Sequence, residues 1–175
     1  MEQTLLGFLM QEPMHGYNLH QRVEAELGEI WYMGISNVYS ALKRLERSGR
    51  VESTLVPQEG NPSRKVYTIT PAGERSFLGW LHRSISTMRR IRVEFPAKLY
   101  FFRALGLEGM QDLIAAQETT CQERVERLEQ KTAPGSPHDI NRLVFDFRRR
   151  QIEAIIGWFQ FCREEWLSSP TGREP

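Results

Sequence analysis

The sequence lacks the features of a secreted or membrane protein. Its 175 residues include only two cysteines, Cys121 and Cys162. These are far apart within helix-like segments, so we expect buried thiols rather than a disulfide framework or a metal knuckle. No apolar run approaches the ~20 residues that cross a bilayer, and no basic stretch precedes the first apolar segment, as it would in a signal peptide. The sequence therefore predicts a cytoplasmic protein that does not bind membranes.

An excess of charge of one sign is also missing. Lys plus Arg number 23 and Asp plus Glu number 22, which gives a formal net charge of +1. Residues 1–80 hold 8 basic against 9 acidic residues, so neither part of the chain attracts a polyanion by its total charge. A nucleic acid partner would need a local cluster of cations.

Signatures of catalysis and of metal binding are absent from the sequence. It has no glycine-rich phosphate loop, no paired catalytic carboxylates and no nucleophile elbow. His15, His20, His82 and His138 do not have the spacing of metal ligands. We therefore expect no enzyme activity, no cofactor and no metal.

The pattern of apolar residues changes near residue 82, which predicts two domains, 1–82 and 83–175. The first domain has short helices, two strands and a helix capped by Thr70 and Pro71, whereas the second has long helices only. The predicted fold is mainly α with a small β-hairpin. We expect helices at 4–10, 17–27, 36–48, from 71, 88–105, 107–131 and 139–167, and strands at 51–56 and 65–70.

The order of the first elements is that of a winged helix-turn-helix, in which the third helix enters the major groove of DNA. Ser36 is its expected N-cap, and its polar face has hydroxyls and an amide near the start and cations farther on. A merely solvated face is the alternative interpretation. The residues that we expect to contact bases or phosphates are Ser36, Asn37, Tyr39, Ser40, Lys43, Arg44 and Arg47, with Arg64 and Lys65 in the hairpin.

The last expected helix is apolar around much of its circumference. Val144, Phe147, Ile155, Trp158 and Cys162 follow one side, and Ile152, Ile156, Phe159, Phe161 and Trp166 spread around it. One neighbouring helix cannot cover this surface. It requires either two packing partners within the chain or a second subunit.

Several segments of the first 75 residues resemble the PadR-type transcriptional regulators. They are Leu5–Leu9, His15–Tyr17, Val38–Glu46, Gly49 and Ser63–Gly73. The region that begins with Phe95–Phe102 is similar to the longer subgroup, whose C-terminal part resembles that of virulence activator alpha proteins. Arg50 departs from the family pattern, in which many members have an apolar residue there, and either packing or a phosphate contact is open for it.

The resemblance implies a homodimeric winged-helix regulator, usually a repressor, that binds an inverted repeat in double-stranded DNA. It assigns DNA contacts to Tyr39, Lys43, Arg44, Arg64 and Lys65, and either a phosphate contact or buried packing to Tyr17. It implies dimerisation through the antiparallel C-terminal helices, for which the candidates are Val144, Phe147, Ile155, Trp158, Phe159 and Cys162. Some members release DNA on binding aromatic molecules, and the candidates for such a pocket are Trp80, Trp158, Phe161 and Trp166. The alternative function is a helical adaptor that binds another protein through its aromatic face.

Overall fold

The structure is a computed structural model, and it describes residues 2–58, 61–131 and 140–168. It confirms a mainly helical chain with a small antiparallel sheet. The chain forms two compact units, one of residues 1–83 and 89–108 and the other of residues 84–88 and 109–175. Each unit is described below by itself.

Three short helices open the first unit: α1 (Glu2–Leu9), α2 (Gly16–Leu27) and α3 (Ile35–Arg47). Apolar residues three and four apart bury one side of each helix, as Val38, Ala41, Leu42 and Leu45 do in α3. The expectation that Ser36 caps α3 is wrong, because Gly34 is the N-cap and the helix begins one residue before Ser36. Ser36 therefore lies in the first turn of the helix.

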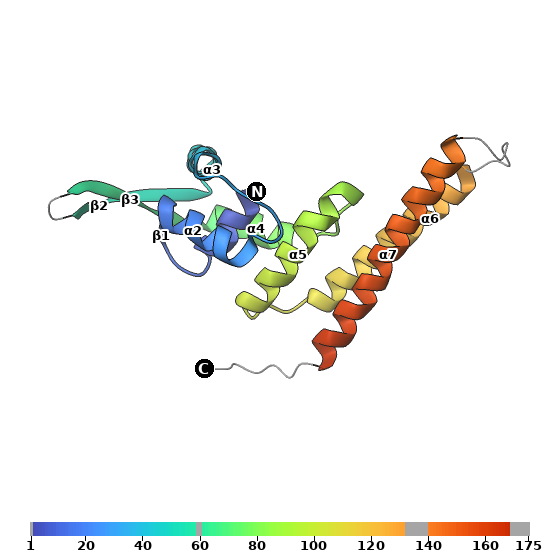
Figure 1. Ribbon diagram of the computed structural model, residues 1–175. Helices are drawn as coiled ribbons and strands as arrows, with labels where there is room; N and C mark the ends of the chain where they lie inside the picture. The colour runs from blue at the N-terminus through green and yellow to red at the C-terminus, as the bar shows by residue number, and fades with distance from the viewer. Residues whose placement is uncertain (1, 59–60, 132–139, 169–175) are drawn as a thin grey trace. The chain divides into compact units, whose positions relative to one another are not determined.

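The sheet has three antiparallel strands in the order β1-β3-β2. β2 (Val51–Gln58) and β3 (Asn61–Ile69) form the expected hairpin, which is longer than the sequence indicated and extends away from the helices (Figure 1). β1 (Met14–His15) pairs with Val66 and Tyr67 of β3. Two residues are too few to show an alternating pattern, so the sequence did not reveal β1.

Two more helices complete the first unit: α4 (Pro71–Leu81) and α5 (Met88–Ala104). The expected cap of α4 is confirmed, because Thr70 Oγ1 accepts a hydrogen bond of 3.2 Å from the N–H of Gly73. The rings of Phe8 and Phe77 contact Phe101 of α5 at 5.2 and 5.3 Å between centroids. By packing, α5 thus belongs with the first helices, although the change in sequence pattern precedes it. The functional boundary after residue 82 stays a prediction.

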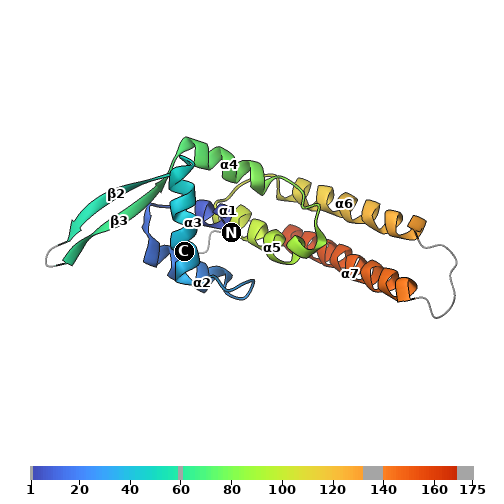
Figure 2. The same cartoon turned by 90° about the horizontal axis from the view of Figure 1, so that it is seen from above.

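The second unit is an antiparallel pair of long helices, α6 (Met110–Lys131) and α7 (Ile140–Ser168) (Figure 2). α6 begins later than expected, because Gly106 and Gly109 have φ angles of +61° and +97°, which a right-handed helix does not contain. Buried residues at spacings of three and four follow one side of α6, namely Met110, Ile114, Gln117, Cys121 and Leu128. The alternation of threes and fours in the sequence predicts a packing seam of these five residues and Val125, which is half-buried.

No helix in the described ranges is long and apolar enough to cross a membrane. Within the same residues, no group of three or more histidine, cysteine, aspartate or glutamate side chains is placed to hold a metal ion.

Candidate nucleic-acid interface

The outer side of α3 is a continuous polar surface. All seven of its expected contact residues are exposed, while the opposite side of the helix is buried in the core. No other described element of the first unit lies over this side (Figures 1 and 2). These seven residues are Ser36, Asn37, Tyr39, Ser40, Lys43, Arg44 and Arg47, and Ile35 at the start of α3 is exposed as well.

Tyr39 lies against the start of α2. A Cβ atom added to Gly16 would be 2.6 Å from Cε1 of Tyr39, so only glycine leaves room for this ring. The neighbouring Tyr17 is 54% exposed, and its hydroxyl accepts a hydrogen bond of 3.3 Å from Nε2 of Gln21. Of the two alternatives for Tyr17, buried packing is therefore excluded. Both tyrosines are accessible to a ligand on the α3 side.

Glu46, the single acidic residue of α3, joins this helix to the hairpin. Its carboxylate accepts hydrogen bonds from Nζ of Lys65 at 3.1 and 3.3 Å and from the hydroxyl of Ser53. The hydrogen bonds from Ser53 and from Lys65 hold the pKa of Glu46 below its usual value. That Glu46 binds the hairpin was not predicted from the sequence. A single acidic residue among the cations of α3 was the feature that could have indicated it. Lys65 thus positions the hairpin relative to α3.

Arg44 is likewise paired within the chain. Its Nε lies 2.6 Å from Oε1 of Glu2 on α1. In contrast, Lys43, Arg47 and Arg64 have no ion pair with any residue that the structure describes. These three are the expected contact cations whose charge is not already balanced by a neighbouring carboxylate.

The hairpin separates the two cations that we expected to act together. Leu55 pairs with Lys65, and Val56 with Arg64. Because directly paired residues share a face and successive residues alternate, Lys65 and Arg64 point to opposite faces of the sheet. Lys65 is hydrogen-bonded to Glu46 of α3. Arg64 could therefore bind only a phosphate that lies on the opposite face of the hairpin.

The expected dimerisation residues divide into buried and exposed ones. Phe159 is fully buried, so it presents no surface to a partner. Ile155 and Cys162 are half-buried. Val144, Phe147 and Trp158 are exposed, and Phe147 has 61% of its surface accessible. α6 therefore covers one side of α7 and leaves the other apolar side uncovered within the described unit.

The expected effector residues are not all in one unit. Trp80 packs in the first unit, where it lies on Phe77 and its Nε1 donates a hydrogen bond of 3.4 Å to Glu94. Trp158 and Phe161 lie on α7 of the second unit. The side chain of Trp166 is outside the described residues.

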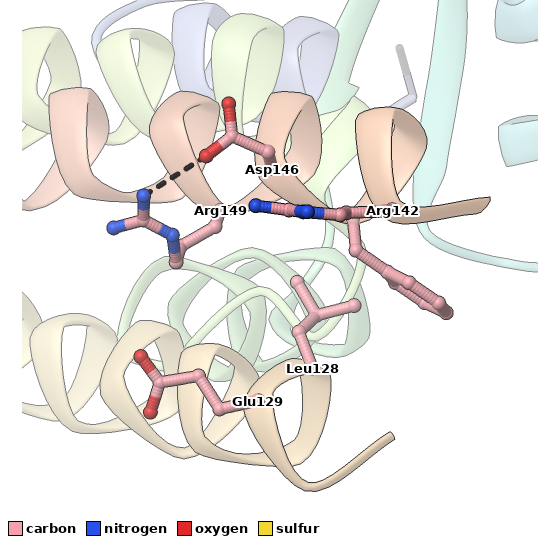
Figure 3. Close-up of a pocket in the computed structure, with 6 residues that line it drawn as sticks. Leu128, Glu129, Arg142, Asp146 and Arg149 are labelled. Atoms are coloured by element: carbon pink, nitrogen blue, oxygen red, sulfur yellow. Dashed lines mark hydrogen bonds and ion pairs between the residues drawn. The ribbon is translucent and has the colours of Figure 1, made fainter. Parts of the chain in front are cut away.

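A pocket of about 250 Å³ lies between the end of α6 and the start of α7 (Figure 3). Its lining is largely charged, and Arg149 pairs with Asp146 at 3.0 Å. It contains none of the expected effector residues. The lining residues are Leu128, Glu129, Arg142, Phe145, Asp146 and Arg149.

These features define the class of the protein. A three-helix core with an exposed third helix, followed directly by a hairpin and a capped helix, is a winged helix-turn-helix. The model of the transcriptional regulator PadR-like family matches residues 5–78, and that of the virulence activator alpha C-terminal domain matches residues 91–166. Residues 5–78 are thus similar to a PadR-like domain, and residues 91–166 to the C-terminal domain of virulence activator alpha proteins.

Two curated relatives align with part of the chain. The negative transcriptional regulator PadR of Bacillus subtilis is 29% identical over 65% of this chain and 63% of its own length. The probable transcriptional regulator Rv1176c of Mycobacterium tuberculosis is 29% identical over 49% of this chain and 46% of its own length. The chain thus spans less than two thirds of each relative. The crystal structure of Bacillus subtilis PadR in complex with operator DNA is 22% identical, covers 92% of this chain and 96% of that one, and has a TM-score of 0.48.

Proposed function

We propose that this chain is a DNA-binding transcriptional repressor without catalytic activity, which acts in the cytoplasm as a homodimer on an inverted repeat. The observation that carries the proposal is the exposed side of α3, on which Lys43 and Arg47 lack an ion-pair partner among the described residues. A helix with such a face fits the major groove, where its first residues reach base edges and its cations reach phosphates.

The number of free cations favours binding by two subunits. Each phosphate that a cation neutralises contributes about −0.9 to the slope of log affinity against log salt. Lys43, Arg47 and Arg64 would thus give one subunit a slope of only about −2.7, which corresponds to weak binding at physiological salt. Two helices joined by a two-fold axis would double the neutralised phosphates and read two half-sites about 34 Å apart. We therefore expect specific binding to require a dimer.

The exposed side of α7 supports the dimer. Large apolar side chains at spacings of three, four and seven or more residues face away from α6, and contiguous apolar surface of this kind marks a protein interface. Pairing with the same helix of a second copy would bury it on both subunits. The exposed members of this α7 stripe are Ile140, Leu143, Val144, Phe147, Trp158 and Phe161.

A small aromatic effector stays a prediction. The relative from Bacillus subtilis is named a negative regulator, and we propose that this chain also represses transcription. Because a ligand that binds only the folded state raises its stability, a thermal-shift screen with aromatic acids tests for an effector. A ligand that raises the unfolding temperature and also weakens DNA binding would identify it.

The DNA-binding proposal is tested on duplexes that the full-length protein selects from a random-sequence pool. The variant with Lys43→Ala and Arg47→Ala should bind the selected duplex at least ~10-fold more weakly, with a shallower salt dependence. A matched control replaces Arg124 and Arg148, two exposed arginines of the second unit, by alanine. Equal affinities and equal salt slopes for the wild type and the α3 variant would overturn the assignment.

A protein-binding adaptor is the second candidate, because the α7 stripe would also fit a foreign helix. Light scattering of the full-length protein separates the two functions. The repressor should have twice the mass of the 20.4 kDa chain at micromolar concentration. A monomer that selects no duplex from the pool would favour the adaptor.

A further inference from the structure

A cluster of unpaired arginines lies in the first unit outside α3 and the hairpin. Residues 76–93 contain four arginines and no acidic residue. Arg90 is paired with Glu94 at 2.5 Å. Arg83, Arg89 and Arg92 are exposed and have no ion-pair partner in the described part of the chain. We call these three residues the arginine cluster.

The start of α5 is an unfavourable place for these charges. The positive end of a helix dipole favours acidic residues in the first turn, and like charges so close together repel one another. α5 has no acidic residue in its first turn and places Arg89 and Arg92 within one turn of each other. Arginines that are placed unfavourably in this way, with no carboxylate beside them, are common at functional sites, where a bound partner supplies the negative charge.

The backbone at the first arginine of the cluster is held in place by a buried side chain. Lys98, which is 1% exposed, donates a hydrogen bond from Nζ to the carbonyl oxygen of Arg83. Arg89 and Arg92 lie on the regular helix α5. The three arginines therefore extend from an ordered backbone, which lowers the entropy cost of binding an anion.

The cluster belongs to the same compact unit as α3. Residues 1–83 and 89–108 form one unit, so all three arginines keep a fixed relation to the recognition helix. In Figure 1 the first turn of α5 is at the upper end of that helix, on the same side of the unit as α3. A duplex that rests on α3 and continues on that side of the unit would pass the first turn of α5, the helix that carries Arg89 and Arg92.

We propose that Arg83, Arg89 and Arg92 form a second phosphate-binding surface, which binds the DNA backbone outside the bases that α3 reads. The inference rests on the proposed function. Guanidinium groups bind phosphate oxygens with paired N–H donors and carry no sequence information when they do so. The cluster therefore adds affinity and fixes orientation without changing which bases are selected.

The test compares full-length variants on one duplex, which the wild type selects from a random-sequence pool. The variant with Arg83, Arg89 and Arg92 replaced by alanine should bind about 10-fold more weakly at ~100 mM salt. Its salt slope should be shallower by about 0.9 for each phosphate that the variant no longer neutralises. Its hydroxyl-radical footprint should lack protection at backbone positions that remain protected when only Lys43 and Arg47 are replaced. Replacement of all three arginines by lysine should restore most of the slope.

A matched control removes three arginines of the second unit, Arg124, Arg142 and Arg148, which are exposed and make no ion pair with a described residue. It changes the net charge equally and should leave affinity and footprint unchanged. If the cluster variant has the slope and footprint of the wild type, the proposal is overturned, while loss of binding in the α3 variant would still uphold the proposed function. If the wild type selects no duplex, both are overturned.

Discussion

The two units of this chain complete their cores in different ways. In the first unit, Phe8, Phe77 and Phe101 are fully buried by elements of the same unit. In the second, Phe147 and Phe161 of α7 have more than half of their surface exposed. The first unit thus has a closed apolar core, whereas the helix pair leaves large apolar side chains exposed.

Ion pairs do not divide the units in this way. Arg44 with Glu2 and Lys65 with Glu46 join separate elements of the first unit. In the second unit, Arg163 of α7 likewise pairs with Glu118 of α6. Pairs within one helix, such as those of Arg149 and Arg150 with Asp146, stabilise that helix by about 0.2–0.5 kcal/mol each and fix no tertiary arrangement. The difference between the units therefore lies in their apolar cores.

The largest expected effect comes from opening the core of the first unit. Replacement of Phe101 by alanine removes a ring that packs on Phe8 and Phe77 and leaves a cavity, which should lower the free energy of unfolding by about 3–5 kcal/mol. Urea unfolding of the full-length protein measures this change. The exposed Phe161→Ala is the matched control and should change it by less than about 1 kcal/mol at concentrations where the chain is monomeric. Equal losses would contradict the contrast between the units.

The next effect concerns association of the second unit. A charge in the middle of the α7 stripe would be buried without a counter-charge in a dimer, so Phe147→Glu should weaken dimerisation by about 100-fold or more. Sedimentation equilibrium measures the dissociation constant. Gln160→Glu, which adds the same charge at another exposed position of α7, should have little effect. An unchanged constant for Phe147→Glu would show that the stripe is not the interface.

A smaller effect depends on pH and arises inside the first unit. Burial lowers the pKa of Lys98 to about 8 from 10.5, the value that applies in the unfolded chain. Between these two values the unfolded chain binds a proton that the folded chain lacks, so the free energy of unfolding should rise with pH, by on the order of 2 kcal/mol. Lys98→Met should lack this rise. Urea unfolding of both proteins from pH 7 to 10.5 measures the difference between their free energies of unfolding, which separates the contribution of Lys98 from that of other titrating groups. Parallel pH curves for the two proteins would refute the prediction.

The smallest effect concerns the ion pair between α3 and the hairpin. The lowered pKa of Glu46 means that its stabilising contribution is present above its ordinary value of 4.5 and is lost as the pH falls through the lower value in the folded state. Because the group is partly exposed, the contribution should be about 0.2–1 kcal/mol. Glu46→Gln should therefore be less stable than the wild type at pH 7, and this difference should shrink as the pH falls below 4.5. A difference that stays constant with pH would exclude this carboxylate as the cause.

The sequence predicted most elements of the fold, because they depend on local signals. The apolar spacing of α3, the Thr70-Pro71 cap of α4 and the seam of α6 all act over a few residues. The two features that were missed or wrongly predicted, β1 and the N-cap of α3, are also local. The two-residue β1 has too little pattern to detect. Gly34, with an extended backbone (φ −61°, ψ 147°), is the N-cap of α3 in place of Ser36, and no side-chain hydrogen bond caps the helix.

The amino-acid sequence by itself determined that the chain forms a winged helix-turn-helix with long helices after it, and which residues lie on the polar side of α3. Only the tertiary structure decided how those residues are used. It paired Arg44 with Glu2 and Lys65 with Glu46, buried Phe159 and left Lys43, Arg47 and the α7 stripe accessible. The physical reason is range: helix periodicity and capping act within one or two turns, whereas an ion pair or a buried ring depends on elements that only folding brings together.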